Sequence, residues 1–126
     1  MQLINLTEES ADNIANINRS AGAEFLQSWE WGKLIASEGE IIERWGVEDN
    51  GKIRAAITMI KKLLGGAFFY WYAPRGPIGE KEAVSFLLKT LKQKNSGALF
   101  LRFEPSALPS GNFKKSVSFQ PQKTLL

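Results

Sequence analysis

The sequence contains neither cysteine nor histidine. Without cysteine there is no disulfide and no thiol nucleophile. The absence of both residue types also excludes a Ser-His-Asp triad, a Cys-His pair and the usual zinc sites. Any catalysis must therefore rest on carboxylates, lysines, tyrosines, backbone amides or groups of the substrate, and we expect neither a metal nor a cofactor.

Long apolar runs are missing as well. No stretch approaches the ~20 residues of a membrane-spanning helix, and the N-terminus lacks the basic and apolar segments of a secretory signal. The 126 residues are 44% hydrophobic and 23% charged, a balance typical of one soluble domain, and we expect a cytoplasmic chain. The net charge of +3 favours a polyanionic partner or reflects a basic surface kept for solubility.

The first forty residues predict a strand and two helices. Residues 2–6 alternate like a short edge strand. Thr7 is a candidate N-cap for a helix that runs through Arg19. Ser28 is a candidate N-cap for a second helix, which Gly39 would stop.

The middle of the chain predicts a three-stranded antiparallel meander. Residues 40–49 alternate as a half-buried strand, and Asn50-Gly51 is a strong signal for a tight hairpin turn into a second strand over residues 52–62. The third strand, residues 67–73 (AFFYWYA), is apolar on both faces. This pattern predicts a central strand that is covered on both sides.

The last third begins with a Pro- and Gly-rich break at residues 74–79. A helix follows, because apolar residues recur on one helical face at Ala83, Val84, Leu87, Leu88 and Leu91. Residues 98–105 predict a strand, residues 106–116 a loop and residues 117–126 a further extended segment. An apolar strand that stops unfinished would leave an open edge, and we expect a homodimer or strand exchange through it.

The order of these elements is strand, two helices, meander, helix and strand. It matches the fold of the GCN5-related N-acetyltransferases, an α+β layout in which helices pack on a mostly antiparallel sheet. The order of elements bears on the fold more than on function.

Three stretches resemble segments of one family when they are taken together. FLQSWEWGKL (residues 25–34), YAPRGPIG (residues 72–79) and LRFEPSAL followed by FQPQKTLL stand in the order found in the FemAB proteins, the peptidoglycan bridge-forming aminoacyltransferases. The resemblance covers nearly the whole chain. It implies transfer of an amino acid from aminoacyl-tRNA to the stem peptide of a peptidoglycan precursor, either a UDP-muramyl peptide or its lipid-linked form at the inner face of the membrane.

Proteins of this family are normally longer and contain two acetyltransferase-like domains. Residues 1–126 would then be a single domain, the truncated first one, which contributes to precursor binding and is not active alone. The reaction is attack of an amine on an activated ester, which requires neither a metal nor a covalent nucleophile. We therefore assign no catalytic residue from the sequence.

Glu104 and Arg75 are candidates for the precursor site, Glu104 on the resemblance and Arg75 on its place in a turn. Glu104 ends the strand before Pro105 and matches an acidic residue that contacts the precursor in the family; it could equally be a solvated acid paired with Arg102. Arg75 lies in the turn between Pro74 and Gly76, where a cation could meet a phosphate or simply serve an ordinary turn.

The same turn bears on the alternative function, an acetyl-CoA-dependent N-acetyltransferase. In those enzymes the corresponding loop offers backbone N–H groups to the pyrophosphate. Here the glycine spacing differs, Pro77 has no N–H and Glu80 would repel phosphate, so we expect no coenzyme A binding. A third alternative is a non-catalytic domain that dimerises through its C-terminal strand.

The tryptophan-rich stretch at the second helix divides between two faces. Trp31, Leu34 and Ile35 share one face, which predicts that Trp31 belongs to the core. Trp29 and Lys33 lie on the other side, where they could bind an anionic nucleotide sugar. Lys33 is the first candidate for a phosphate contact. The pairs Lys61-Lys62 and Lys114-Lys115 are expected to be solvated strand or loop ends.

Overall fold

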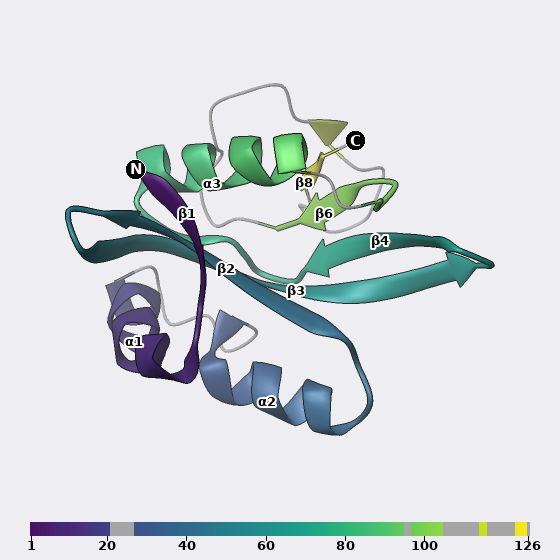
Figure 1. Ribbon diagram of the computed structural model, residues 1–126, viewed down its shortest axis with the longest axis horizontal. Helices are drawn as coiled ribbons and strands as arrows, with labels where there is room; N and C mark the ends of the chain where they lie inside the picture. Colours follow the sequence, from purple (N-terminus) through teal and green to yellow (C-terminus); the bar gives the residue numbers. More distant parts are fainter. Residues whose placement is uncertain (21–26, 95–96, 105–113, 116–122, 126) are drawn as a thin grey trace.

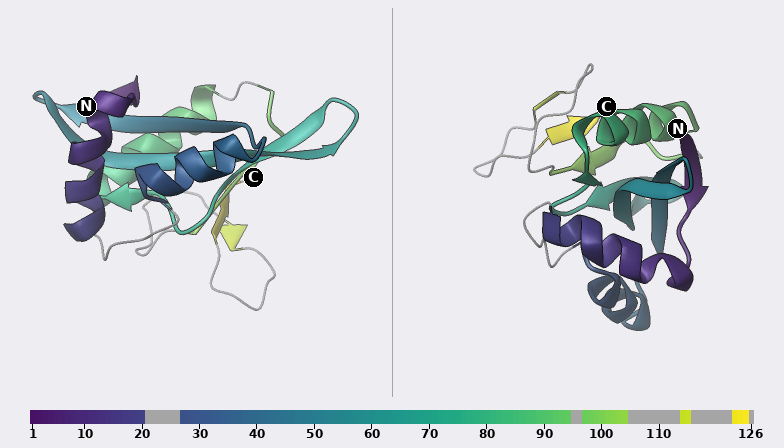
Figure 2. Two further views of the ribbon diagram at one scale, coloured as in Figure 1. Left: turned by 90° about the horizontal axis from the view of Figure 1, so that it is seen from below. Right: turned by 90° about the vertical axis from the view of Figure 1, so that its left-hand side faces the viewer.

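The computed structural model describes residues 1–20, 27–94, 97–104, 114–115 and 123–125. A twisted sheet forms the middle layer. Helices α1 (Ala11–Ser20) and α2 (Trp29–Ser37) cover one face, and α3 (Lys81–Lys94) covers the other (Figures 1 and 2). This arrangement confirms the predicted α+β, acetyltransferase-like fold.

The strands are β1 (Gln2–Asn5), β2 (Ile42–Asp49), β3 (Lys52–Gly65), β4 (Phe68–Ala73), β5 (Ile78–Gly79), β6 (Leu101–Phe103), β7 (Lys114–Lys115) and β8 (Lys123–Leu125). Their order in the sheet is β1-β2-β3-β4-β6-β8-β7, and β5 pairs with β3. Neighbours are antiparallel except β4 and β6, which are parallel.

The local signals in the first half place the helices and the meander. Ser28 caps α2, since its Oγ accepts a hydrogen bond from the Trp31 backbone N–H at 3.2 Å. Thr7 precedes a 3₁₀ turn, Glu8–Ser10, that leads into α1. Asn50 and Gly51 have φ values of 53° and 78°, as the tight hairpin turn between β2 and β3 requires.

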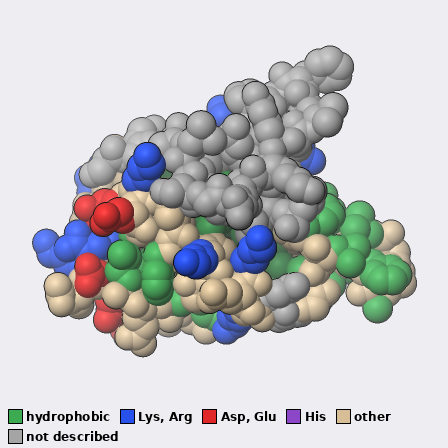
Figure 3. Space-filling model, turned by 90° about the horizontal axis from the view of Figure 1, so that it is seen from above, with side chains coloured by type: hydrophobic (Ala, Val, Ile, Leu, Met, Phe, Trp, Pro, Cys, Tyr) green, Lys and Arg blue, Asp and Glu red, His purple; other side chains and the backbone are tan. Residues whose placement is uncertain are grey.

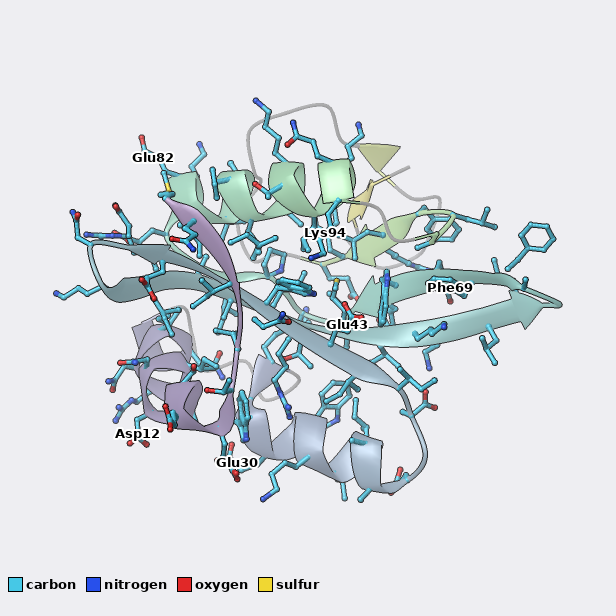
Figure 4. All side chains as sticks on the ribbon, in the orientation of Figure 1. Asp12, Glu30, Glu43, Phe69, Glu82 and Lys94 are labelled. Atoms are coloured by element: carbon cyan, nitrogen blue, oxygen red, sulfur yellow. The ribbon has the colours of Figure 1, made fainter. Side chains whose placement is uncertain are left out.

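The main apolar core lies between the sheet and α3. Helix α3 contributes the buried residues Ala83, Val84, Leu87 and Leu88, all of them predicted from the helical period. They pack against sheet residues that include Val47, Ile57, Trp71 and Phe103. At the end of this layer Lys94 reaches toward the sheet near Glu43 (Figure 4), with its Nζ 4.1 Å from the centre of the Trp45 ring.

A smaller core lies on the opposite face, under α1. Its buried members are Ile14, Ala56 and Ile78, and Leu6, Ile17 and Trp29 pack against them. Within the described ranges, fewer buried apolar residues thus lie on this face of the sheet than under α3.

Several expectations about the sheet are wrong. Residues 74–79 are not only a turn, because β5 pairs with Ala55 and Ala56 of β3. The stretch expected to be a loop contains β7. The predicted extended C-terminal segment is present as β8, but β8 lies between β6 and β7. Within the described residues β8 is therefore not an edge strand, and a homodimer through the C-terminal strand stays a prediction.

Strand β4 also differs from its prediction, because it is not fully covered on both faces: Tyr70 and Tyr72, on the face away from α3, are only half-buried. Trp71 and Ala73 are buried, whereas Phe68 at the start of the strand is 61% exposed. The β3–β4 hairpin extends beyond α2 and α3 at one end of the molecule (Figure 1). No helix in the described ranges is both long enough and apolar enough to span a membrane.

Candidate functional site

The candidate site lies where the parallel strands β4 and β6 end side by side. Ala73 is paired with Phe103, and beyond this pair the chain leaves β4 through the turn at residues 74–77. The backbone N–H of Glu104 donates to the carbonyl of Gly76 at 2.9 Å. Arg75, exposed in the turn, has φ of 58°. The structure therefore brings two of the predicted residues, Glu104 and Arg75, to one corner.

The side chain of Gln27 connects the turn at this corner to strand β3 by hydrogen bonds. Its Oε1 accepts from the Thr58 N–H at 2.9 Å, and its Nε2 donates to the carbonyls of Pro74 at 2.8 Å and Thr58 at 3.3 Å. Gln27 is only 2% exposed, so these bonds satisfy an amide that would be costly to bury alone. A Cβ on Gly76 would overlap the Gln27 side chain, which explains the glycine in the turn.

The carboxylate of Glu104 is buried and has a tyrosine partner. Glu104 is 8% exposed, and the Tyr72 hydroxyl donates a hydrogen bond to its Oε1. Glu104 is thus no solvated acid. The guanidinium of Arg102 lies 5.9 Å from the centre of the Tyr72 ring, and its buried Nε makes no hydrogen bond within the described residues.

Burial is the main cause of a raised pKa at Tyr72. The hydrogen bond to Glu104 and the charge of that carboxylate add to it, and together they raise the pKa of Tyr72 from 10.0 to about 12. The phenol consequently stays protonated, and remains a donor to Glu104, to a higher pH than an ordinary tyrosine.

The register of the strands defines the face on which this pair lies. Tyr72 is paired with Ile60 on β3 and with Arg102 on β6. Since alternate strand residues share a face, Tyr72 lies on the side of Ala56 and the smaller core. One step toward the hairpin on that side, Tyr70 stacks on Phe100 with ring centres 4.7 Å apart. The corner therefore presents a carboxylate, a cation and aromatic rings together.

The other two predicted residues, Trp29 and Lys33, lie on α2. One face of the Trp29 ring already holds a cation, because the Arg44 guanidinium lies 3.8 Å from the ring centre and donates to the Trp29 carbonyl at 3.2 Å. Burial lowers the pKa of Arg44. Gly32 permits this approach, since a Cβ there would overlap the guanidinium.

Lys33 is exposed and forms an ion pair with Glu8 at 3.7 Å. Trp29 also lines a cavity of about 360 Å³ between α1 and the start of α2, together with Ala11, Ile14, Ala15, Asn18, Arg19, Ser28 and Glu30. The predicted residues thus fall into two groups, one at the strand ends and one on α2.

The prediction that Trp31 belongs to the core is wrong. Trp31 is half-buried, neither apolar cluster contains it, and its helical neighbour Leu34 is 53% exposed. Trp29 is the tryptophan of α2 that packs inward. The helix is turned about its axis relative to the prediction because Trp29 packs against the smaller core and stacks with Arg44.

Sequence reasoning gave no role to Gln27, Tyr72 or Arg44. The one local signal was Gln27 itself, a polar residue directly before the cap Ser28 in a stretch rich in aromatic residues. In the described part of the chain no three acidic residues gather as a metal site would require.

Comparisons with known proteins bear on the family and on the fold. The model of the FemAB family matches residues 6–125. A search of curated proteins by sequence gave no match. Among solved structures, the crystal structure of FemX is similar with a TM-score of 0.66 and 21% identity, and covers 82% of this chain and 27% of the FemX chain.

Two acetyltransferases are similar as well. The aminoglycoside 6'-N-acetyltransferase from Enterococcus faecium has a TM-score of 0.55 at 12% identity, over 82% of this chain and 61% of that chain. The ribosomal-protein-alanine N-acetyltransferase from Brucella melitensis biovar Abortus 2308 has a TM-score of 0.54 at 9% identity, over 95% of this chain and 99% of that chain. At these identities the structural likeness shows the fold alone.

Proposed function

The chain belongs to the FemAB family, and from this premise we propose that it supplies part of the precursor site of an enzyme that transfers an amino acid from aminoacyl-tRNA to the stem peptide of a peptidoglycan precursor. The chain spans 27% of the length of FemX, so we assign it the role of a first domain that binds the precursor and does not complete the reaction alone.

The observation that carries the proposal is the buried carboxylate of Glu104. Burying an anion is costly unless it is hydrogen-bonded, and the Tyr72 hydroxyl provides one such bond. A carboxylate has about four lone-pair sites, of which this bond uses one. The carboxylate can therefore accept hydrogen bonds from an amide or hydroxyl of the precursor.

The surrounding cations suit the rest of such a ligand. Arg75 lies in the turn after β4 and Arg102 on β6, and an arginine can bind a phosphate or carboxylate with two parallel hydrogen bonds. Lys33 remains the first candidate for a phosphate contact, because its exposed ion pair with Glu8 is weak and can exchange partners. Trp29, on the same helix, is the second candidate there, with one ring face already stacked on Arg44.

The transfer itself is a substitution at the carbonyl carbon of the aminoacyl ester. The precursor amine forms a C–N bond with the aminoacyl carbon, the ester C–O bond breaks, and the proton lost by the amine ends on the departing tRNA hydroxyl. We assign no residue of this chain to that proton transfer. Its proposed part is to hold the precursor.

The acetyl-CoA alternative is less consistent with the turn at residues 74–80. Pyrophosphate binding needs free backbone N–H groups, but Gly76 N–H donates to the Ala73 carbonyl at 3.4 Å and Glu80 N–H donates to the Arg54 carbonyl at 3.0 Å. Pro77 has no N–H, and β5 is paired with β3. This part of the chain therefore resembles a closed strand connection more than a phosphate loop.

The proposal is tested by calorimetric titration of the chain with a UDP-linked muramyl pentapeptide, with acetyl-CoA as the comparison. We expect binding of the muramyl peptide, weakened about tenfold or more by Glu104→Gln, since hydrogen bonds to charged groups contribute about 1.5–3 kcal/mol. Glu82→Gln, an exposed acid on α3 labelled in Figure 4, is the matched control and should change nothing. Binding of acetyl-CoA, or of neither ligand, would contradict the proposal for this chain.

A further inference from the structure

The free end of the β3–β4 hairpin carries the most exposed apolar side chains of the described residues. We call residues 63–68 the hairpin tip. Leu63 is 72% exposed, Leu64 53% and Phe68 61%. Figure 3 shows apolar side chains gathered at this end of the molecule. A cluster of this kind on a protruding element normally marks a binding surface.

The hairpin itself carries charge of one sign. Residues 51–79, which include the whole hairpin, contain five basic and no acidic residues. Lys61 and Lys62 directly precede the tip, and as strand neighbours they point to opposite faces of the hairpin. The Nζ of Lys61 lies 4.2 Å from the centre of the Phe69 ring, on the side of α3. Two acids of the neighbouring segment come near the lysines. Glu43 pairs in register with Met59, and Glu40 precedes Ile41, whose carbonyl accepts from the Lys61 N–H at 2.9 Å.

We propose that the hairpin tip docks on a bilayer surface that contains anionic lipids. Leu64 lies two residues beyond Lys62, so apolar side chains reach about 7 Å past the lysines at ~3.3 Å per residue. Interfacial segments bury their apolar side chains about 5–10 Å deep while lysines stay at the level of the headgroups. The spacing of apolar and basic residues on the hairpin matches that depth.

A bilayer fits this surface better than a protein partner does. A stable protein interface buries about 800 Å² on each side. The tip offers three large exposed apolar side chains, far fewer than the about 20–30 residues that such an interface takes from each side. An anionic bilayer needs no complementary shape, and two lysines on opposite faces both meet the headgroups when the hairpin enters tip first.

The inference does not require the proposed function, but it deepens that function where both hold. Tyr72 lies four residues from Phe68 along β4, about 14 Å at ~3.4 Å per residue. A precursor bound at Glu104 would then lie close to the bilayer surface. This favours the lipid-linked precursor over its soluble UDP-linked form.

Vesicle co-sedimentation of the chain tests the inference. Vesicles of phosphatidylcholine alone are compared with vesicles that also contain phosphatidylglycerol. We expect binding to the anionic vesicles only. Leu64→Ser with Phe68→Ser should weaken it about tenfold or more, and Lys61→Gln with Lys62→Gln about fivefold for each lysine. All four side chains are outside the apolar clusters, so the variants should keep the melting temperature of the wild type.

Matched control variants distinguish binding through the hairpin tip from nonspecific binding. Leu34→Ser removes a leucine of α2 with the same 53% exposure as Leu64. Lys89→Gln with Lys92→Gln removes two exposed charges of α3. The controls should bind like the wild type.

Any of four results would overturn the inference. They are equal losses of binding in the tip and control variants, equal binding to neutral vesicles, no binding to either kind of vesicle, and a dimer in sedimentation that Leu64→Ser abolishes. The measurement needs no precursor, so its failure is separate from a failure of the proposed function.

Discussion

The two faces of the central sheet are built from different kinds of side chain. On the side of α3 the buried cluster is apolar, and Val47, Ala73, Leu87, Leu88 and Phe103 have no exposed surface. On the side of α1 and α2 the buried apolar cluster consists, among the described residues, of Ile14, Ala56 and Ile78. On this side, polar contacts made by Gln27 and Arg44 join the helices' end of the chain to the sheet, in addition to the apolar cluster.

The face under α3 thus mainly stabilises the fold, whereas the opposite face carries the polar residues of the candidate site. The stabilisation from apolar burial is roughly proportional to the buried area, and a closely packed core tolerates few changes in side-chain volume. Buried polar groups need specific partners, so they persist where those partners are fixed by the rest of the fold. Glu104, Tyr72 and Arg102 all lie on the polar side, and we expect substitutions on the two sides to have different signatures.

The largest effect is expected on the apolar side, at Phe103. Phe103→Ala would leave a cavity at a fully buried position and should lower the free energy of unfolding by about 3–5 kcal/mol. Urea denaturation followed by far-UV circular dichroism measures this. Leu99→Ala, at a position 53% exposed, is the control and should cost under about 0.5 kcal/mol. Similar costs for both would contradict the distinction between the faces.

A slightly smaller effect is expected at Gln27, through lost hydrogen bonds. Gln27→Leu keeps most of the volume but leaves the Thr58 N–H and the Pro74 carbonyl without this partner. Each unsatisfied buried group costs about 1–3 kcal/mol, so we expect about 3 kcal/mol in total. The exposed Gln93 on α3 supplies the control Gln93→Leu. If Gln27→Leu proves as stable as wild type, the corner is not held by this side chain.

Tyr72→Phe should combine a moderate cost with a distinctive pH dependence. Loss of the bond to a buried carboxylate is expected to cost about 2 kcal/mol near neutral pH. The folded-state pKa of Tyr72 is about 12 against 10.0 when unfolded, so the folded state binds the proton more tightly. The stabilisation linked to this proton is therefore complete below pH 10 and is lost as the pH rises toward 12.

The measurement compares unfolding free energies of wild type and variant across that pH range. The gap between wild type and Tyr72→Phe should narrow as the pH rises above 10. Tyr70→Phe, on a ring that stacks with Phe100, is the control and should leave the wild-type slope unchanged. A gap that is constant with pH would show that the hydroxyl contributes nothing through its proton.

Local signals were enough to predict much of the fold. The Asn50-Gly51 turn, the Ser28 cap and the buried face of α3 each depend on residues close together in the sequence. The pairing of β5 with β3, the Gln27 bonds and the Tyr72–Glu104 bond connect residues far apart. No periodicity encodes such partners, so the sequence placed Glu104 at a strand end but could not supply the tyrosine that holds it.

The smallest effect is expected at Trp31, where the sequence had predicted a core residue. A half-buried side chain outside both apolar clusters leaves little cavity when it is shortened, so Trp31→Ala should cost about 1 kcal/mol. Trp29→Ala should cost about 2 kcal/mol, because it removes packing on the smaller core and the stacking of Arg44. Thermal unfolding of the two variants side by side measures the difference. The reverse order would mean that α2 packs through the face that the helical period first suggested.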